Sequence, residues 1–216
     1  DRMLKKTGGG ALTYDKAKQL ARHHDPRVRQ ELAARTDLMP ELLYFLAADP
    51  DPAVRREIAA NETTPRQADV LLSRDADEAV RTDLVEKIGR VAPELTREQQ
   101  EKVERLTHQV LDQLARDQLV RVRQILSEAL KDLTGAPPDV IRRLARDVEI
   151  AVAGPVLEFS PVLTDEDLLE IIRSTPVEGA LNAISRRDGV SEPVSDAIVE
   201  TDDEGAVADL LANPSA

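Results

Sequence analysis

The chain has 216 residues, of which 41% are hydrophobic but only 2% aromatic, so any core must be aliphatic. It contains no Cys, which excludes disulfides, thiolate zinc sites and cysteine nucleophiles. The net charge of −12 opposes nucleic-acid binding, and no apolar run approaches the ~18 residues of a membrane span. We therefore expect a cytoplasmic protein with no membrane attachment, no cofactor and no metal.

The first segment, residues 1–12, contains three consecutive glycines and predicts a flexible lead-in. A single helical domain is expected over residues 13–213. The last residues, 214–216, read as a tail left by truncation of a longer protein.

An internal repeat begins after the lead-in. Segment 25–33, which starts Asp-Pro-Arg-Val-Arg, returns 26 residues later at 51–59 and more loosely at 77–85. The leading Asp of each copy is expected to cap a helix, with Pro at the first helical position where copies have one. A second short helix is expected before each copy, and these lie at 14–24, 40–48 and 65–73. Residues 13–90 are thus predicted to form regular helix pairs.

The next part, residues 91–146, departs from the regular interval. Its copy of the repeat, centred on Val122, comes 42 residues after Val80. The extra length contains a polar stretch, 97–116, with apolar residues at helical spacing. We expect this stretch to form one long inserted helix.

The last part, residues 147–213, is acidic and its repeats are degenerate. Residues 147–216 carry 16 acidic and 3 basic residues, a net charge of −13. The first of its helices is expected to stop early at Gly154-Pro155, because proline cannot continue a hydrogen-bonded helix. Further helices are expected at 165–174, 177–186, 192–200 and 204–212. The acidic surface either keeps the protein soluble or docks a basic partner.

The Asp-x-x-Val-Arg-x-x-x-Ala pattern resembles the HEAT-like superfamily and the leucine-rich-repeat-variant type of helical repeat. Its 26-residue interval is shorter than the ~40–47 residues of HEAT units. The resemblance implies an all-α fold, a right-handed α-solenoid of about seven short helix pairs. Residues 14–213 also look like one uncharacterised bacterial domain family of unknown function with helical repeats, most specifically at 153–157 and 163–169.

One functional pattern recurs along the repeats. An arginine follows the repeated valine in four copies, and we call these residues the arginine ladder: Arg29, Arg55, Arg81 and Arg123. Each could pair with a carboxylate or carbonyl of the neighbouring unit, with Asp25, Asp51 and Asp77 as candidates. Alternatively, the row could capture an acidic ligand. The ladder stops at the last three copies, where the equivalent residues are predicted to be Ala151, Asn182 and Ala208.

No catalytic constellation is evident in the sequence. His23 and His24 are adjacent and would diverge by about 100° on a helix, so they are not expected to share a metal. The acidic clusters at 165–167 and 202–204 stand at predicted helix starts, where acids cap the helix and interact favourably with the positive end of its dipole.

These patterns favour a non-catalytic protein-interaction scaffold that uses the curved face of a helical repeat stack. Its partner would be a protein, basic where it meets the acidic last third. Two alternatives stay open. The first is a nucleic-acid-binding protein that uses the arginine ladder, and the second is a HEAT-like enzyme with a pocket that the sequence does not reveal.

Overall fold

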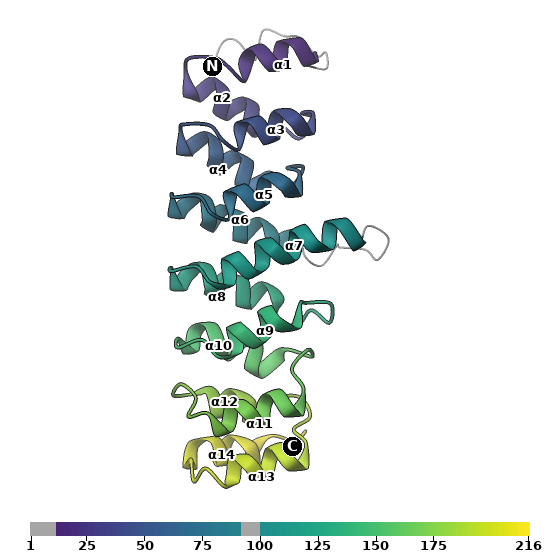
Figure 1. Cartoon of the computed structure of the whole chain (residues 1–216). Coiled ribbons are helices and arrows are strands. Elements are labelled where there is room, and N and C mark those ends of the chain that lie inside the picture. Colours follow the sequence, from purple (N-terminus) through teal and green to yellow (C-terminus); the bar gives the residue numbers. More distant parts are fainter. Residues whose placement is uncertain (1–11, 92–99) are drawn as a thin grey trace. The chain divides into compact units, whose positions relative to one another are not determined.

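The computed structural model describes residues 12–91 and 100–216. Every regular element in these two ranges is a helix, so the predicted all-α fold is confirmed there (Figure 1). None of the described helices is long and apolar enough to cross a lipid bilayer. The chain divides into two compact units, residues 1–84 and 85–216, which are described separately.

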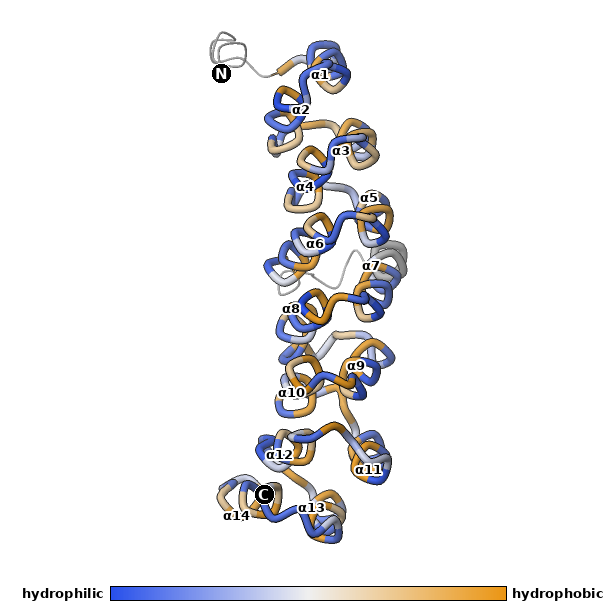
Figure 2. The backbone as a smooth tube through the Cα atoms, turned by 90° about the vertical axis from the view of Figure 1, so that its left-hand side faces the viewer, coloured by the Kyte–Doolittle hydropathy of each residue, from blue (hydrophilic) through white to orange (hydrophobic). Residues whose placement is uncertain are grey.

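Unit 1, residues 1–84, is built from short helices in two rows. Its helices are α1 (Tyr14–Leu20), α2 (Pro26–Ala33), α3 (Pro40–Leu46), α4 (Pro52–Ala60), α5 (Arg66–Leu72) and the first part of α6 (Glu78–Val91). Helix α2 packs against α4, and α3 packs against α5. The even-numbered helices therefore form one row and the odd-numbered helices the other (Figure 2).

Unit 2, residues 85–216, has the same plan. Its helices after α6 are α7 (Gln100–Ala115), α8 (Val120–Leu130), α9 (Pro138–Ala145), α10 (Ile150–Phe159), α11 (Asp165–Arg173), α12 (Ala180–Ser185), α13 (Glu192–Val199) and α14 (Glu204–Ala212). Helix α10 packs between α8 and α12, and α12 packs against α14. In the other row, α7 contacts α9 and α11 contacts α13.

The core of each unit is aliphatic, as the composition predicts. The repeated valines Val54, Val80 and Val122 are fully buried on even-numbered helices, whereas Val28 is half-buried. Each fully buried side chain of this size contributes about 1.5–3 kcal/mol relative to an exposed one. The recurring valine therefore marks the core-facing position of the even row.

The predicted caps begin several helices. The carboxylate of Asp25 accepts a hydrogen bond from the Arg27 N–H at 2.9 Å, and Asp51 accepts from the Ala53 N–H at 2.8 Å. Proline occupies the first helical position after both. Each cap contributes ~1 kcal/mol, because it satisfies an amide that the helix cannot.

Helix α11 begins with a reciprocal capping box. The Thr164 hydroxyl accepts from the Asp167 N–H at 3.2 Å, and the Asp167 carboxylate accepts from the Thr164 N–H at 3.1 Å. Burial by itself would raise the pKa of Asp167, but hydrogen bonds from Thr164 and Arg142 outweigh it and hold this pKa below its ordinary value of 3.8.

Asp167 is therefore expected to make the stability of unit 2 depend on pH. The folded pKa is depressed, so the stabilisation is present above 3.8 and is lost as the pH falls through the folded value. We expect Asp167→Asn to lower the free energy of unfolding by about 1 kcal/mol near neutral pH. The same change should have a smaller effect near pH 2, measured by urea unfolding at both pH values. Equal losses at both would show that the carboxylate charge does not matter.

Helix α10 corrects one expectation, because it runs through Gly154-Pro155 to Phe159 instead of ending early. Proline removes the N–H that would reach the carbonyl of Ala151, but Ala151 is exposed and water can bond to this carbonyl. The residue before a proline resists helical geometry partly through its Cβ, which Gly154 lacks. The helix ends at Phe159, and Ser160 is its C-cap.

Some predicted bounds differ from the observed ones. Helix α1 ends at Leu20 instead of residue 24, and α12 begins at Ala180 instead of residue 177. The long inserted helix is described from Gln100, and its buried stripe contains Val110 and Leu114. Residues 97–99 and most of the predicted lead-in lie outside the described residues.

Two asparagines make the same bridge between neighbouring even-numbered helices. The Asn61 side-chain amide donates to the carbonyls of Ala33 and Arg35, both at 2.8 Å. The Asn213 amide donates to the carbonyls of Ser185 and Arg187, at 2.9 and 2.8 Å. Each asparagine thus satisfies the carbonyls at the end of the preceding even-numbered helix.

Asn61→Ala is expected to destabilise unit 1 by about 1–3 kcal/mol, because it leaves two carbonyls without their donor in a buried setting. Chemical unfolding monitored by circular dichroism measures this loss. Glu62→Ala serves as the control, since it changes the next, exposed residue. A loss no larger than that of the control would contradict a structural role for the bridge.

Candidate functional site

Each arginine of the ladder lies on an even-numbered helix, and Arg55 shows the contacts that it makes with the neighbouring turns. The Arg55 Nε and Nη2 donate to the two carboxylate oxygens of Asp75 at 2.7 and 3.0 Å. Its Nη1 donates to the carbonyls of Asp49 and Pro50 at 2.8 and 3.2 Å. The side chains of Arg55 and Asp75 are only 17% and 8% exposed. Arg55 therefore joins the start of its own helix to the turn that follows the next odd-numbered helix.

Two other ladder arginines make the same contacts. Arg29 forms a bidentate pair with Asp49, and Arg123 forms one with Asp147. Arg81 repeats the backbone contact, because its Nη1 donates to the Asp75 carbonyl at 2.8 Å. The ladder is thus a recurring structural joint in the described residues.

The carboxylate partners differ from the candidates Asp25, Asp51 and Asp77. Each of these three caps its own helix, as the bond from the Ala79 N–H to Asp77 at 2.8 Å illustrates. The arginine partner lies two residues earlier, at Asp49 or Asp75. This earlier aspartate also accepts the N–H two residues on, which shapes the turn.

The guanidinium groups have little capacity left for a ligand. Arg29 uses four of its five N–H donors, two on Asp49 and two on the carbonyls of His23 and His24. Hydrogen bonding to Asp75 raises the pKa of Arg55, and hydrogen bonding to Asp147 raises that of Arg123. An acidic ligand would have to displace a buried carboxylate.

The degenerate copies also need a correction of register. The prediction of Ala151 as the arginine equivalent places Ile150 at the valine position, but Ile150 is 39% exposed and Val152 is the buried residue. In the two later copies, the residues that are buried at the valine position are Ala180 and Ala206. The arginine positions that follow them are Ala153, Leu181 and Val207, in place of Ala151, Asn182 and Ala208. Asp147 occupies the place of the capping Asp in the predicted register of this copy. In the structure it pairs with Arg123, and the N-cap of α10 is Glu149.

The histidines occupy a different setting from the one expected. His23 and His24 follow the end of α1, and their rings stack with centroids 4.4 Å apart instead of diverging. His23 Nδ1 accepts the Asp25 N–H at 3.1 Å, as the turn aspartates do in later copies. Across residues 12–91 and 107–216, no three His, Asp or Glu side chains gather where they could hold a metal ion.

All four aromatic residues of the chain are exposed. Tyr14, Tyr44, Phe45 and Phe159 expose between 43% and 50% of their surface. Large aromatic side chains are enriched at the binding hot spots of proteins, where they bury much area with few rotamers. Their position outside the core marks them as candidates for contact with a partner.

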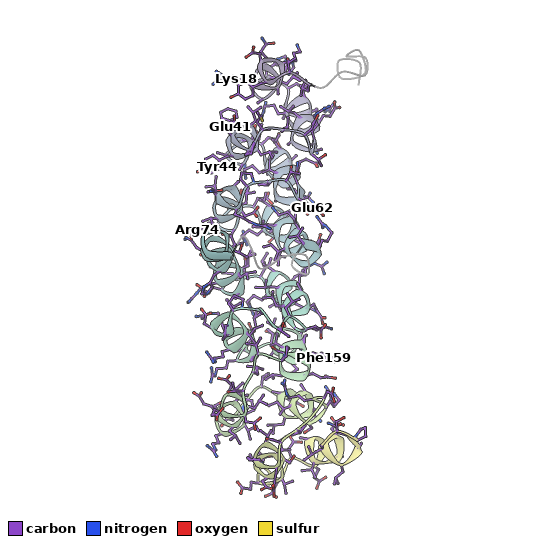
Figure 3. The ribbon with its side chains drawn as sticks, turned by 90° about the vertical axis from the view of Figure 1, so that its right-hand side faces the viewer. Lys18, Glu41, Tyr44, Glu62, Arg74 and Phe159 are labelled. Atoms are coloured by element: carbon purple, nitrogen blue, oxygen red, sulfur yellow. The ribbon has the colours of Figure 1, made fainter. Side chains whose placement is uncertain are left out.

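Two of these aromatics lie on α3, beside an open pocket of about 520 Å³ in unit 1. The pocket is lined mainly by α3, α5 and the turns that follow them, including Tyr44, Gln67, Val70, Leu71 and Arg74, and Arg55 of α4 also lines it. Figure 3 shows Tyr44 and Arg74 on the side of the odd-numbered helices. We call Tyr44, Phe45 and Leu71, together with this pocket, the α3–α5 surface.

Charge on the α3–α5 surface is unbalanced toward the positive. The lining carboxylates Asp49 and Asp75 are neutralised by Arg29 and Arg55. Arg74 makes no ion pair within the described part of the chain. At the other edge, the Arg22 guanidinium lies 5.9 Å from the centroid of the Phe45 ring. The surface therefore combines apolar area with two exposed cations and with one exposed carboxylate, that of Glu41, which lies one turn before Tyr44 and Phe45 on α3.

A family model described as an uncharacterised protein conserved in bacteria, DUF2336, matches residues 152–216. This match supports the expected likeness to a bacterial domain of unknown function over the acidic part of unit 2. Searches of the curated proteins and of the solved structures found no significant match.

Proposed function

We propose that the chain is a non-catalytic, cytoplasmic interaction scaffold, a right-handed α-solenoid of about seven helix pairs, that binds a protein through the α3–α5 surface. The observation that carries this proposal is that all four aromatic residues are exposed, whereas the core is built from aliphatic side chains. Tyr44, Phe45 and Leu71 would supply the anchors of the interface. The two rows of helices within each unit support the solenoid arrangement.

The alternatives have weaker support. Nucleic-acid binding through the arginine ladder would compete with the bidentate ion pairs of Arg29, Arg55 and Arg123. An enzyme would need a reactive group in a pocket. In the α3–α5 pocket both carboxylates, Asp49 and Asp75, are held by arginines and shape turns.

The proposal is tested by affinity capture from a bacterial lysate with quantitative mass spectrometry. The full chain is compared with the double variant Tyr44→Ser, Leu71→Ser. We expect specific proteins to be retained by the wild type and to fall at least about tenfold with the variant. Both residues are more than 40% exposed, so the variant should keep its fold.

Leu211→Ser provides the matched control, because it removes an exposed apolar side chain from unit 2. It should leave the captured set unchanged. If the double variant captures the same proteins as the wild type while circular dichroism shows an intact fold, the α3–α5 surface is not the binding site.

A further inference from the structure

We propose that the α3–α5 surface recognises an acidic segment of its protein partner, with an apolar side chain against Tyr44 and Leu71 and a carboxylate on Arg74. This inference rests on the proposed function and adds the chemistry of the partner. The expectation of a basic partner concerns the acidic residues 147–216 and does not extend to unit 1.

The apolar part of the site is built by α3 and α5. Leu42, Leu43 and Leu46 face the core, so the helix turns Tyr44 and Phe45 outward. On α5, Leu72 is buried and Leu71 is 43% exposed beside the pocket. A large apolar side chain in the pocket would contact Tyr44 on one wall and Leu71 on the other, both of which line it.

The charged part of the site comes from the turns after α1 and α5. Arg74 lines the pocket, and its guanidinium pairs with no carboxylate in the described ranges. Among the described residues, Arg22 contacts the face of Phe45, and this contact leaves its N–H donors available. Every aspartate that lines the pocket already has an arginine partner. Within the pocket lining, the charge left for a ligand is therefore that of Arg74, and it is complemented by Asp or Glu.

A protein segment fits these features better than a nucleic acid does. Nucleic acids are held mainly by many phosphate contacts, and the pocket lining offers one uncommitted guanidinium. Unit 1 has no excess of positive charge, since residues 1–84 carry 14 basic and 15 acidic residues. A peptide needs only one apolar anchor and one or two carboxylates.

The test is a selection of random peptides displayed on phage against the full chain, with parallel selections on Tyr44→Ala and Arg74→Glu. We expect peptides that depend on Tyr44 to be rich in Asp or Glu next to Leu, Phe, Tyr or Trp. Their affinity should fall about tenfold or more with either variant. Arg121→Glu, which changes an exposed arginine of unit 2, should leave their affinity unchanged.

The outcomes separate this inference from the proposed function. Peptides that depend on Tyr44 but are basic or uncharged would overturn the acidic partner and leave the binding surface intact. If the selection yields no peptide whose binding depends on Tyr44, both the acidic partner and the proposed binding surface are overturned. A labelled oligothymidine strand that binds the wild type and loses affinity with Tyr44→Ala would also overturn the proposal, in favour of a nucleic acid.

Discussion

Val54→Asp is expected to unfold unit 1. Val54 is fully buried between helices of the even row, and the substitution places a carboxylate there without a cation or hydrogen-bond donor. Burial of an unpaired charge belongs to the few mechanisms that cost more than about 4 kcal/mol. A unit of this size has only about 5–15 kcal/mol of stability to lose.

Thermal and urea unfolding followed by circular dichroism measure this effect. The matched control is Val148→Asp, the same chemical change at a residue that is 78% exposed. The control should unfold like the wild type, whereas Val54→Asp should lose a large part of its helical signal. A wild-type melting curve for Val54→Asp would mean that the repeated valine does not face the core.

The pair formed by Arg55 and Asp75 is expected to give the second-largest effect. Arg55→Met should cost about 3–5 kcal/mol, because it leaves the mostly buried Asp75 carboxylate without its cation. Asp75→Asn should cost less, since an asparagine oxygen can still accept the Asp77 N–H. The double variant should be more stable than the sum of the single changes predicts, by about 0.5–3 kcal/mol.

The exposed pair of Arg35 and Asp37 offers a direct comparison. Its side chains are 34% and 51% exposed, so Arg35→Met should cost less than about 1 kcal/mol. Urea unfolding of all variants at one pH gives the required free energies. If Arg55→Met costs no more than Arg35→Met, the ladder is not a structural joint, and its donors become candidates for ligand binding.

Much of the fold could be predicted because its local signals agree. Asp25 and Asp51 cap helices where Asp-Pro precedes the repeated Val-Arg step, and Val54 and Val80 are buried as the repeat requires. Gly154-Pro155 was the misleading signal. Its effect on a helix depends on whether water can reach the freed carbonyl, and a sequence does not reveal this exposure.

The arginine partners could have been found from spacing. One aspartate is enough to cap a helix, yet two stand in Asp49-Pro50-Asp51 and two in Asp75-Ala76-Asp77. The first of each pair was free for another role. Which arginine reaches it depends on how successive helices pack, and this packing joins residues 20 positions apart.

The exposure of Tyr44 and Phe45 could also be predicted from the sequence. Within 40–46, the leucines at positions 42, 43 and 46 form one helical stripe, which places Tyr44 and Phe45 on the opposite face. Their contribution to a pocket could not be predicted, because Leu71 and Arg74 reach it from another helix pair. The match to a bacterial domain family covers only residues 152–216 and does not include this surface.

Site-specific photo-crosslinking tests the central claim most directly. A photoreactive phenylalanine analogue replaces Tyr44 in one sample and Glu62, on the opposite side of unit 1, in another (Figure 3). After irradiation in a bacterial lysate, we expect discrete protein adducts from position 44, competed by acidic apolar peptides, and none from position 62. Equal adduct patterns at the two positions, or no adduct at position 44, would contradict the account.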